Sequence, residues 1–114
     1  MAEQPDFGEL MQKAQEMQTK MQDAQKRIAA MEKEGVAGAG LVRVRMNGQH
    51  QSTAVQIDAS LLRADDDSKE MLEDLVKAAI NDAAKKVEEG ARAIMQDIAG
   101  DMNLPGGFGG GMAN

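Results

Sequence analysis

Apolar residues recur at alternating steps of four and three over residues 9–33, and this spacing predicts one long helix. It is the repeat of a coiled-coil seam. The seam positions are Leu10, Ala14, Met17, Met21, Ala24, Ile28 and Met31. The intervening positions are rich in Gln, Lys and Glu, which favour helices, and neither Gly nor Pro interrupts them before Gly35. We therefore expect a helix over about 7–34, ended by Gly35.

A β-hairpin is predicted next, because residues 41–46 alternate between apolar and polar and the dipeptide Asn47-Gly48 is a strong turn signal. A two-residue turn there places Val44 opposite Gln51 and Val42 opposite Thr53. One face of the hairpin then carries Val42, Val44, Met46, Thr53, Val55 and Ile57. The other carries Arg43, Arg45, His50, Ser52 and Gln56. The glycine-rich residues before Leu41 are a candidate third strand, which gives a sheet over about 35–58.

A second apolar stripe at helical spacing follows an acidic cluster, and it predicts a helix over about 67–99. Asp67 and Glu70 have the spacing of a capping box. The stripe consists of Leu72, Val76, Ile80, Ala83, Ala84, Val87, Ala91, Ile94 and Ile98. Gly90 is a candidate break in this helix. Residues 104–114 are rich in glycine and are expected to form a flexible tail after a single domain over 1–103.

The predicted order is helix, three-stranded antiparallel sheet, helix, which describes an α+β subunit of two layers. A strand of six residues covers only about 20 Å, whereas a helix of about 25 residues spans nearly 38 Å. The first helix must therefore overhang the sheet and leave part of its apolar seam exposed. Because such a seam is usually buried in a second copy, we expect a homodimer.

The composition excludes several classes of chemistry. With no Cys and one His among 114 residues, a disulfide framework, a thiolate metal site and a Cys nucleophile are excluded, and little remains for acid–base catalysis. We expect no enzymatic activity, no cofactor, no metal site and no small-molecule substrate. No stretch is long and apolar enough to cross a bilayer, so we expect a cytoplasmic protein.

The net charge of −6 is unevenly distributed along the chain. All of it lies in residues 64–114, whereas residues 10–64 have an excess of three basic groups. On the first helix Lys13, Lys20 and Arg27 recur every seven residues beside the seam, where salt bridges to another helix and contacts to DNA phosphates are both open interpretations. For Arg43 and Arg45, phosphate contact and protection of the sheet edge are equally open. With two Phe and no Tyr or Trp, stacking on single strands is disfavoured, so a nucleic-acid ligand would be a duplex held by its phosphates.

Several segments, taken in order, resemble the YbaB/EbfC family of bacterial nucleoid-associated proteins over about 7–108. They are residues 10–18 (LMQKAQEMQ), 38–42 (GAGLV), 44–48 (VRMNG), 55–62 (VQIDASLL), 69–75 (KEMLEDL), 79–83 (AINDA) and 104–108 (LPGGF). Ala59 stands where the family often has Pro. The resemblance implies a dimer joined through its sheets, with helices projecting like the arms of tweezers. It also implies binding to duplex DNA at the nucleoid, with an influence on chromosome organisation and gene expression.

From charge placement we predict that DNA is bound by Lys13, Lys20, Arg27, Arg43 and Arg45. The predicted dimer interface is the apolar face of the sheet, formed by Val42, Val44, Met46, Val55 and Ile57. An alternative hypothesis is a helical adaptor or scaffold that engages a protein partner through the Met-rich seam or the acidic second helix.

Overall fold

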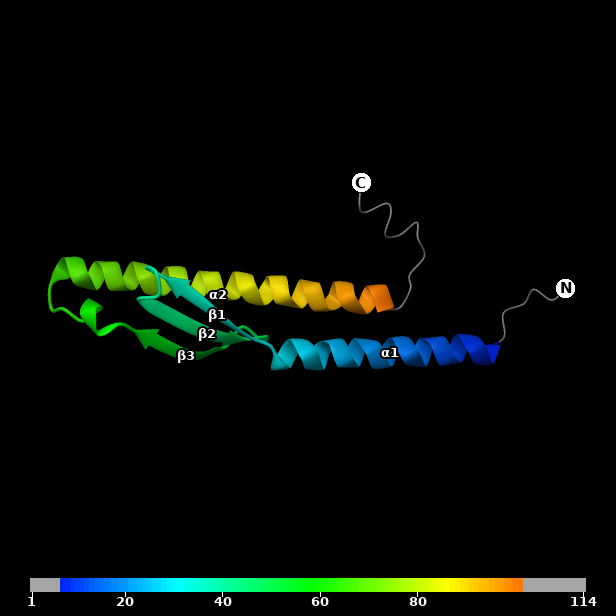
Figure 1. The fold of residues 1–114 in the computed structure, drawn as a ribbon. Coiled ribbons are helices and arrows are strands. Elements are labelled where there is room, and N and C mark those ends of the chain that lie inside the picture. Colours follow the sequence, from blue (N-terminus) through cyan, green and yellow to red (C-terminus); the bar gives the residue numbers. More distant parts are fainter. Residues whose placement is uncertain (1–6, 102–114) are drawn as a thin grey trace, which may run out of the picture.

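The computed structural model describes residues 7–101, which are arranged along one long helix (Figure 1). The elements are α1 (Phe7–Ala30), β1 (Glu32–Ala37), β2 (Val42–Asn47), β3 (Ser52–Ile57), the 3-10 turn η1 (Ala59–Leu61) and α2 (Asp66–Asp101). The three strands form an antiparallel sheet in the order β1-β2-β3. The predicted α+β class and element order are confirmed. The expected tail over 104–114 lies outside the described residues.

The helix α2 packs against both the sheet and α1, which together form the second layer. Its 36 residues span about 54 Å at the usual helical rise. The first half of α2 covers one face of the sheet, and the second half runs beside α1 in the opposite direction (Figure 1). The helix α1 therefore lies beyond the end of the sheet, where it packs against α2 and touches the β2–β3 turn between Ile28 and Gly48, instead of overhanging a sheet that it covers.

The core lies between β2 and the first half of α2. Val42 and Val44 are fully buried and pack with small residues of the helix, Ala79 and Ala83. Because those alanines have short side chains, the main chain of β1 can lie directly on the helix. A Cβ on Gly35 would overlap the Ala79 carbonyl oxygen and the Ala83 amide nitrogen. Gly35 is therefore required by this close approach.

The first helix ends at Ala30 rather than near residue 34, and Glu32–Ala37 is a strand. The residues Glu32, Lys33 and Glu34 favour a helix locally. They are extended here because β1 pairs with β2 over its whole length, from Glu32 opposite Asn47 to Ala37 opposite Val42. Pairing and packing on α2 thus outweigh local propensity. The third strand expected near residues 35–40 is present, but it begins earlier.

The β2–β3 hairpin has a different register from the one predicted. Val44 lies opposite Val55 and Val42 opposite Ile57, with a bulge at Arg45/Met46. The turn is longer because the Asn47 side chain accepts hydrogen bonds from the backbone of Gln49 (2.9 Å) and Gln51 (3.0 Å). Val42, Val44, Val55 and Ile57 still share one face because the register changes by an even number of residues.

The helix α2 is continuous and begins at Asp66, before its predicted capping box. Asp65, not Asp67, caps it, since the Asp65 carboxylate accepts from the Ser68 amide at 2.7 Å. Gly90 does not break the helix. Its missing side chain leaves room for the Met31 sulfur at the junction of α1 and β1.

The two edges of the sheet differ in how their backbone groups are satisfied. At β1, the Val36 amide donates to the Asp82 carboxylate (2.9 Å), and the Glu34 carbonyl accepts from the Lys86 ammonium (3.0 Å). Side chains of α2 thus close this edge against further strand pairing. All six residues of β3 are exposed, including Val55 and Ile57 on the apolar side. The open edge is therefore the one at β3.

Replacing Gly35 by Ala tests the close packing of β1 on α2. We expect Gly35→Ala to lower the free energy of unfolding by about 3 kcal/mol, because the added Cβ forces the strand away from the helix. Gly100→Ala is the control, since nothing lies within 4 Å of its Cβ position and Ala favours a helix. Urea unfolding followed by circular dichroism measures both. Equal stability of Gly35→Ala and the wild type would contradict this packing.

Removing the Asp82 carboxylate tests the closed edge of β1. The Val36 amide and Lys86 lower the pKa of Asp82, so its stabilisation is present above its unfolded value of 3.8 and is lost as the pH falls below it. We expect Asp82→Ala to cost about 1 kcal/mol at pH 7, a modest value because the side chain is one-third exposed. Urea unfolding at pH 7 and pH 2.5 should show this difference disappearing in acid. Asp74→Ala, an exposed carboxylate on the same helix, is the control, and a pH-independent cost for Asp82→Ala would refute the ionic contribution.

Candidate nucleic-acid interface

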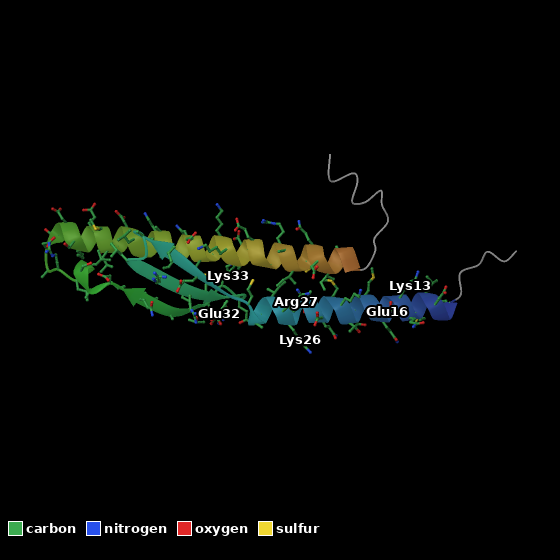
Figure 2. All side chains as sticks on the ribbon, viewed as in Figure 1. Lys13, Glu16, Lys26, Arg27, Glu32 and Lys33 are labelled. Atoms are coloured by element: carbon green, nitrogen blue, oxygen red, sulfur yellow. The ribbon has the colours of Figure 1, made fainter. Side chains whose placement is uncertain are left out.

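The N-terminal half of α1 projects from the body of the chain. Only near its C-terminal end does α1 pack closely, where Ala24 is fully buried and Ile28 partly buried. Lys13 and Glu16 lie on the portion that extends past the described end of α2 (Figure 2). Leu10, Met11 and Met17 are about half exposed there, at 49%, 51% and 48%. We call residues 7–21 the arm.

The three basic residues that recur every seven positions along α1 have different surroundings. Arg27, nearest to the body, forms an ion pair with Asp97 of α2 at 3.5 Å. Lys20 is partly buried. Lys13 is exposed on the arm, and within residues 7–101 no ion pair involves it. The arm therefore presents Lys13 to solvent, whereas Arg27 already has a carboxylate partner.

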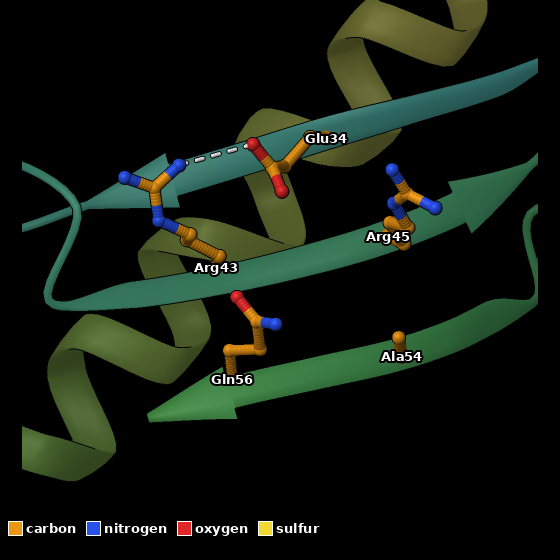
Figure 3. Close-up of a pocket in the computed structure, with 5 residues that line it drawn as sticks. All are labelled: Glu34, Arg43, Arg45, Ala54 and Gln56. Atoms are coloured by element: carbon orange, nitrogen blue, oxygen red, sulfur yellow. Dashed lines mark hydrogen bonds and ion pairs between the residues drawn. The ribbon is translucent and has the colours of Figure 1, made fainter. Parts of the chain in front are cut away.

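Arg43 and Arg45 lie on the face of the sheet that is turned away from α2 (Figure 3). Each is paired with a carboxylate of β1. Arg43 contacts Glu34 at 3.2 Å, and Arg45 contacts Glu32 at 3.4 Å. These pairs are diagonal, because the register sets Glu34 directly opposite Arg45, and long side chains reach across that spacing. Glu34 thus pairs with Arg43 while its backbone lies opposite Arg45.

The sequence predicts this charged sheet face only in part. We define the charged sheet face as Glu32, Glu34, Arg43, Arg45, Thr53 and Gln56. The helical pattern places both glutamates in the first helix, which leaves the arginines without acidic partners. The Thr53 hydroxyl donates to the Glu32 carboxylate at 3.3 Å, so Thr53 belongs to this face and not to the apolar one. Two positive and two negative groups give the face no net charge. The alternation of charge in Glu32-Lys33-Glu34 is the sequence signal that points to a strand.

A shallow hollow of about 290 Å³ lies on this face, lined by Glu34, Arg43, Arg45, Ala54 and Gln56 (Figure 3). The small Ala54 side chain leaves the guanidinium group of Arg45 accessible, and the Gln56 amide lies beside Arg43. Both arginine side chains are about half exposed, at 45% and 58%. Guanidinium groups with this access can bind an anion such as a phosphate.

The five predicted DNA-binding residues do not form one surface in a single chain. Arg27 points toward α2, whereas Arg43 and Arg45 point away from it across the sheet. The structure therefore separates a group on α1 from a group on the charged sheet face. The role of each group in binding DNA stays a prediction.

The residues predicted for the dimer interface are also divided. Val42, Val44 and Met46 are buried under α2 of the same chain. Val55 and Ile57 lie beyond the cover of α2 and are exposed, at 51% and 38%. An apolar groove of about 520 Å³ begins beside β3. Its lining is Ile57, Leu72, Glu73, Val76, Lys77, Ile80 and Asn81. Of the five residues, only Val55 and Ile57 thus offer accessible surface to a second copy.

The shifted pKa values of acidic groups in residues 7–101 have structural explanations. The pKa of Asp58 is lowered mainly because its carboxylate accepts from the Ser60 hydroxyl and amide, which caps η1.

His50 is exposed in the hairpin turn with φ of +63°. Within the same residues, no three His, Cys, Asp or Glu side chains gather closely enough to hold a metal ion. No helix in the described range has the length and apolar character needed to span a membrane.

Comparison with known proteins agrees with this architecture. The sequence model of the YbaB/EbfC DNA-binding family matches residues 3–102. The crystal structure of an uncharacterized protein, HP0035 from Helicobacter pylori, is similar, with a TM-score of 0.65 and 26% sequence identity. That match covers 84% of this chain and 99% of the other.

Proposed function

The chain belongs to the YbaB/EbfC DNA-binding family, and we propose that it is a nucleoid-associated protein that binds duplex DNA as a homodimer, without catalysis. In this role it contributes to chromosome organisation and gene regulation in the cytoplasm. The family match over nearly the whole chain carries the proposal. The projecting arm with its exposed Lys13 supports it, because a basic side chain held away from an acidic body can reach a phosphate backbone.

We expect the basic side chains of the arm to hold DNA through contacts to its phosphates. Lys13 and Lys20 are ammonium groups, which act as point charges toward phosphates and carry little sequence information. The chain has a net charge of −6, which opposes approach to DNA. Binding is therefore expected to tolerate many sequences and to weaken steeply as salt increases.

The open edge of β3 supports a dimer joined through the sheets. The Asp58 amide donates to the Leu41 carbonyl at 2.8 Å, so by alternation the amides of Val55 and Ile57 point to the outer edge. A second β3 strand, related by two-fold symmetry, would satisfy these groups and cover the apolar groove. Because side chains of α2 close the β1 edge, pairing at β3 also limits assembly to two copies.

The exposed apolar residues of the arm favour a second candidate function, a helical adaptor for a protein partner. Leu10, Met11 and Met17 form an adaptable apolar stripe that no described residue covers fully. An adaptor would bind its partner whether or not DNA is present. Loss of duplex binding at low salt, together with a stable complex with another protein, would favour this alternative.

Removing the two lysine charges of the arm tests the proposed DNA contacts. We expect Lys13→Gln/Lys20→Gln to weaken binding to a duplex at least about tenfold, and to reduce the slope of log affinity against log salt by up to about 3.6, because four ammonium groups are lost per dimer. Fluorescence anisotropy with a labelled duplex measures both. Lys69→Gln/Lys85→Gln removes the same charge from exposed positions of α2 and is the control. If the two double variants lost equal affinity for the duplex, the effect would be due to net charge alone and not to contacts made by the arm.

A charged side chain on β3 tests the dimer. We expect Ile57→Asp to convert a particle of twice 12.2 kDa into a monomer, because the aspartate would be buried without a partner at the β3 edge. Light scattering after size exclusion measures the mass. Met17→Asp, on the exposed arm, is the comparison variant and should remain dimeric. A dimer that persists in Ile57→Asp, or that is lost only in Met17→Asp, would place the interface elsewhere.

A further inference from the structure

We propose that Glu32 and Glu34 occupy the sites on Arg43 and Arg45 that DNA phosphates would take, so that the charged sheet face is a phosphate site held partly closed by its own carboxylates. This inference rests on the proposed function and names the residues that set its affinity. It assigns a role to the two glutamate side chains, which are needed neither for the core nor for the closed edge of β1.

The geometry makes each carboxylate a substitute for a phosphate. A phosphate offers a guanidinium group the same kind of acceptor oxygens as a carboxylate does. The Glu34 oxygen lies 3.2 Å from a terminal nitrogen of Arg43, and the Glu32 oxygen lies 3.4 Å from one of Arg45. Both glutamates come from the neighbouring strand β1, so the fold holds them beside the arginines whether or not DNA is present.

The exposure of the pairs makes them displaceable. The four side chains are between 41% and 58% exposed, so water reaches both members of each pair. Exposed ion pairs with one contact per pair are weak and are screened by salt. A polyanion that presents several phosphates can therefore displace the carboxylates from the arginines. Each displacement lowers the affinity for DNA, because the displaced carboxylate remains beside the bound phosphate.

The rest of the face is suited to a bound phosphate chain. The hollow between the two arginines is lined by Ala54, which leaves space, and by the Gln56 amide, which can donate to a phosphate oxygen (Figure 3). Arg43 and Arg45 alternate along β2, which sets their backbone positions about 6.7 Å apart and aims both at the same side of the sheet. Two phosphates on one DNA strand can thus be contacted at once.

The test is the affinity of Glu32→Gln/Glu34→Gln for a labelled DNA duplex, measured by fluorescence anisotropy over a range of salt. Glutamine keeps the size of each side chain but removes the charge. We expect binding about threefold to tenfold tighter than that of the wild type, because each released arginine binds a phosphate in place of an intramolecular carboxylate. We also expect a steeper salt dependence, by about 0.9 for each additional phosphate that the arginines bind.

Two controls separate local release of the arginines from a change in net charge. Glu88→Gln/Glu89→Gln removes the same two charges from exposed positions of α2 and should tighten binding less. In the background of Arg43→Gln/Arg45→Gln, the glutamate changes should give no more than this control effect. Circular dichroism and urea unfolding establish that each variant keeps the fold.

The outcomes distinguish this inference from the function on which it rests. Duplex binding by the wild type, with equal increases in affinity for Glu32→Gln/Glu34→Gln and Glu88→Gln/Glu89→Gln, would overturn the role of the glutamates and leave the function standing. An increase that persists without Arg43 and Arg45 would do the same. Absence of binding at low salt by the wild type and by every variant would overturn both.

Discussion

The contact between the main chain of β1 and the helix α2 is the constraint on which the other features depend. Gly35 brings the strand against Ala79 and Ala83 so closely that no side chain fits between them. This position sets the edge of β1 within reach of Asp82 and Lys86, which close it. It also aims the alternate residues of β1, Glu32 and Glu34, at the opposite face, beside the arginines of β2. A single close approach thereby determines both the open edge and the charge of the exposed face.

Charge compensation limits how strongly this acidic member of a DNA-binding family is expected to hold DNA. Three arginines lie beside a carboxylate of the same chain: Arg27 beside Asp97, Arg43 beside Glu34 and Arg45 beside Glu32. We therefore expect weak adhesion to polyanions in general, since a phosphate that binds one of these arginines must replace an existing pair. The proposed contact with DNA, which we expect to be weak, salt-sensitive and sequence-tolerant, would suit a protein that organises a chromosome rather than one that reads a single operator.

The sequence predicts the features that depend on local periodicity and misses those that depend on contacts between distant residues. The stripes of α1 and α2 and the alternation in β2 repeat over many residues, so element type and order follow from them. The start of β1 cannot be predicted in this way, because Glu32-Lys33-Glu34 favours a helix locally and is extended only through its pairing with β2. The close approach of the hairpin turn to α1 is likewise not visible in the local pattern, since a Cβ on Gly48 would overlap the Ile28 carbonyl.

In the candidate site, too, some features follow from local periodicity and others depend on contacts between distant residues. The positions of Lys13 and Lys20 along one side of α1 follow from the heptad, and the distance of Lys13 from the body follows from the length of the helix. The neutral charge of the sheet face could not be predicted without the strand that supplies its glutamates. Likewise, the division of the apolar face into buried Val42 and Val44 and exposed Val55 and Ile57 required the width of sheet that α2 covers.

Binding of duplex DNA through its phosphates, as proposed for this chain, is best measured as the affinity of the wild-type protein for two duplexes of unrelated sequence between about 50 and 200 mM salt. We expect similar affinities for both duplexes and a steep, linear fall of log affinity with log salt. Absence of binding at the lowest salt, or an affinity that salt does not change, would contradict it.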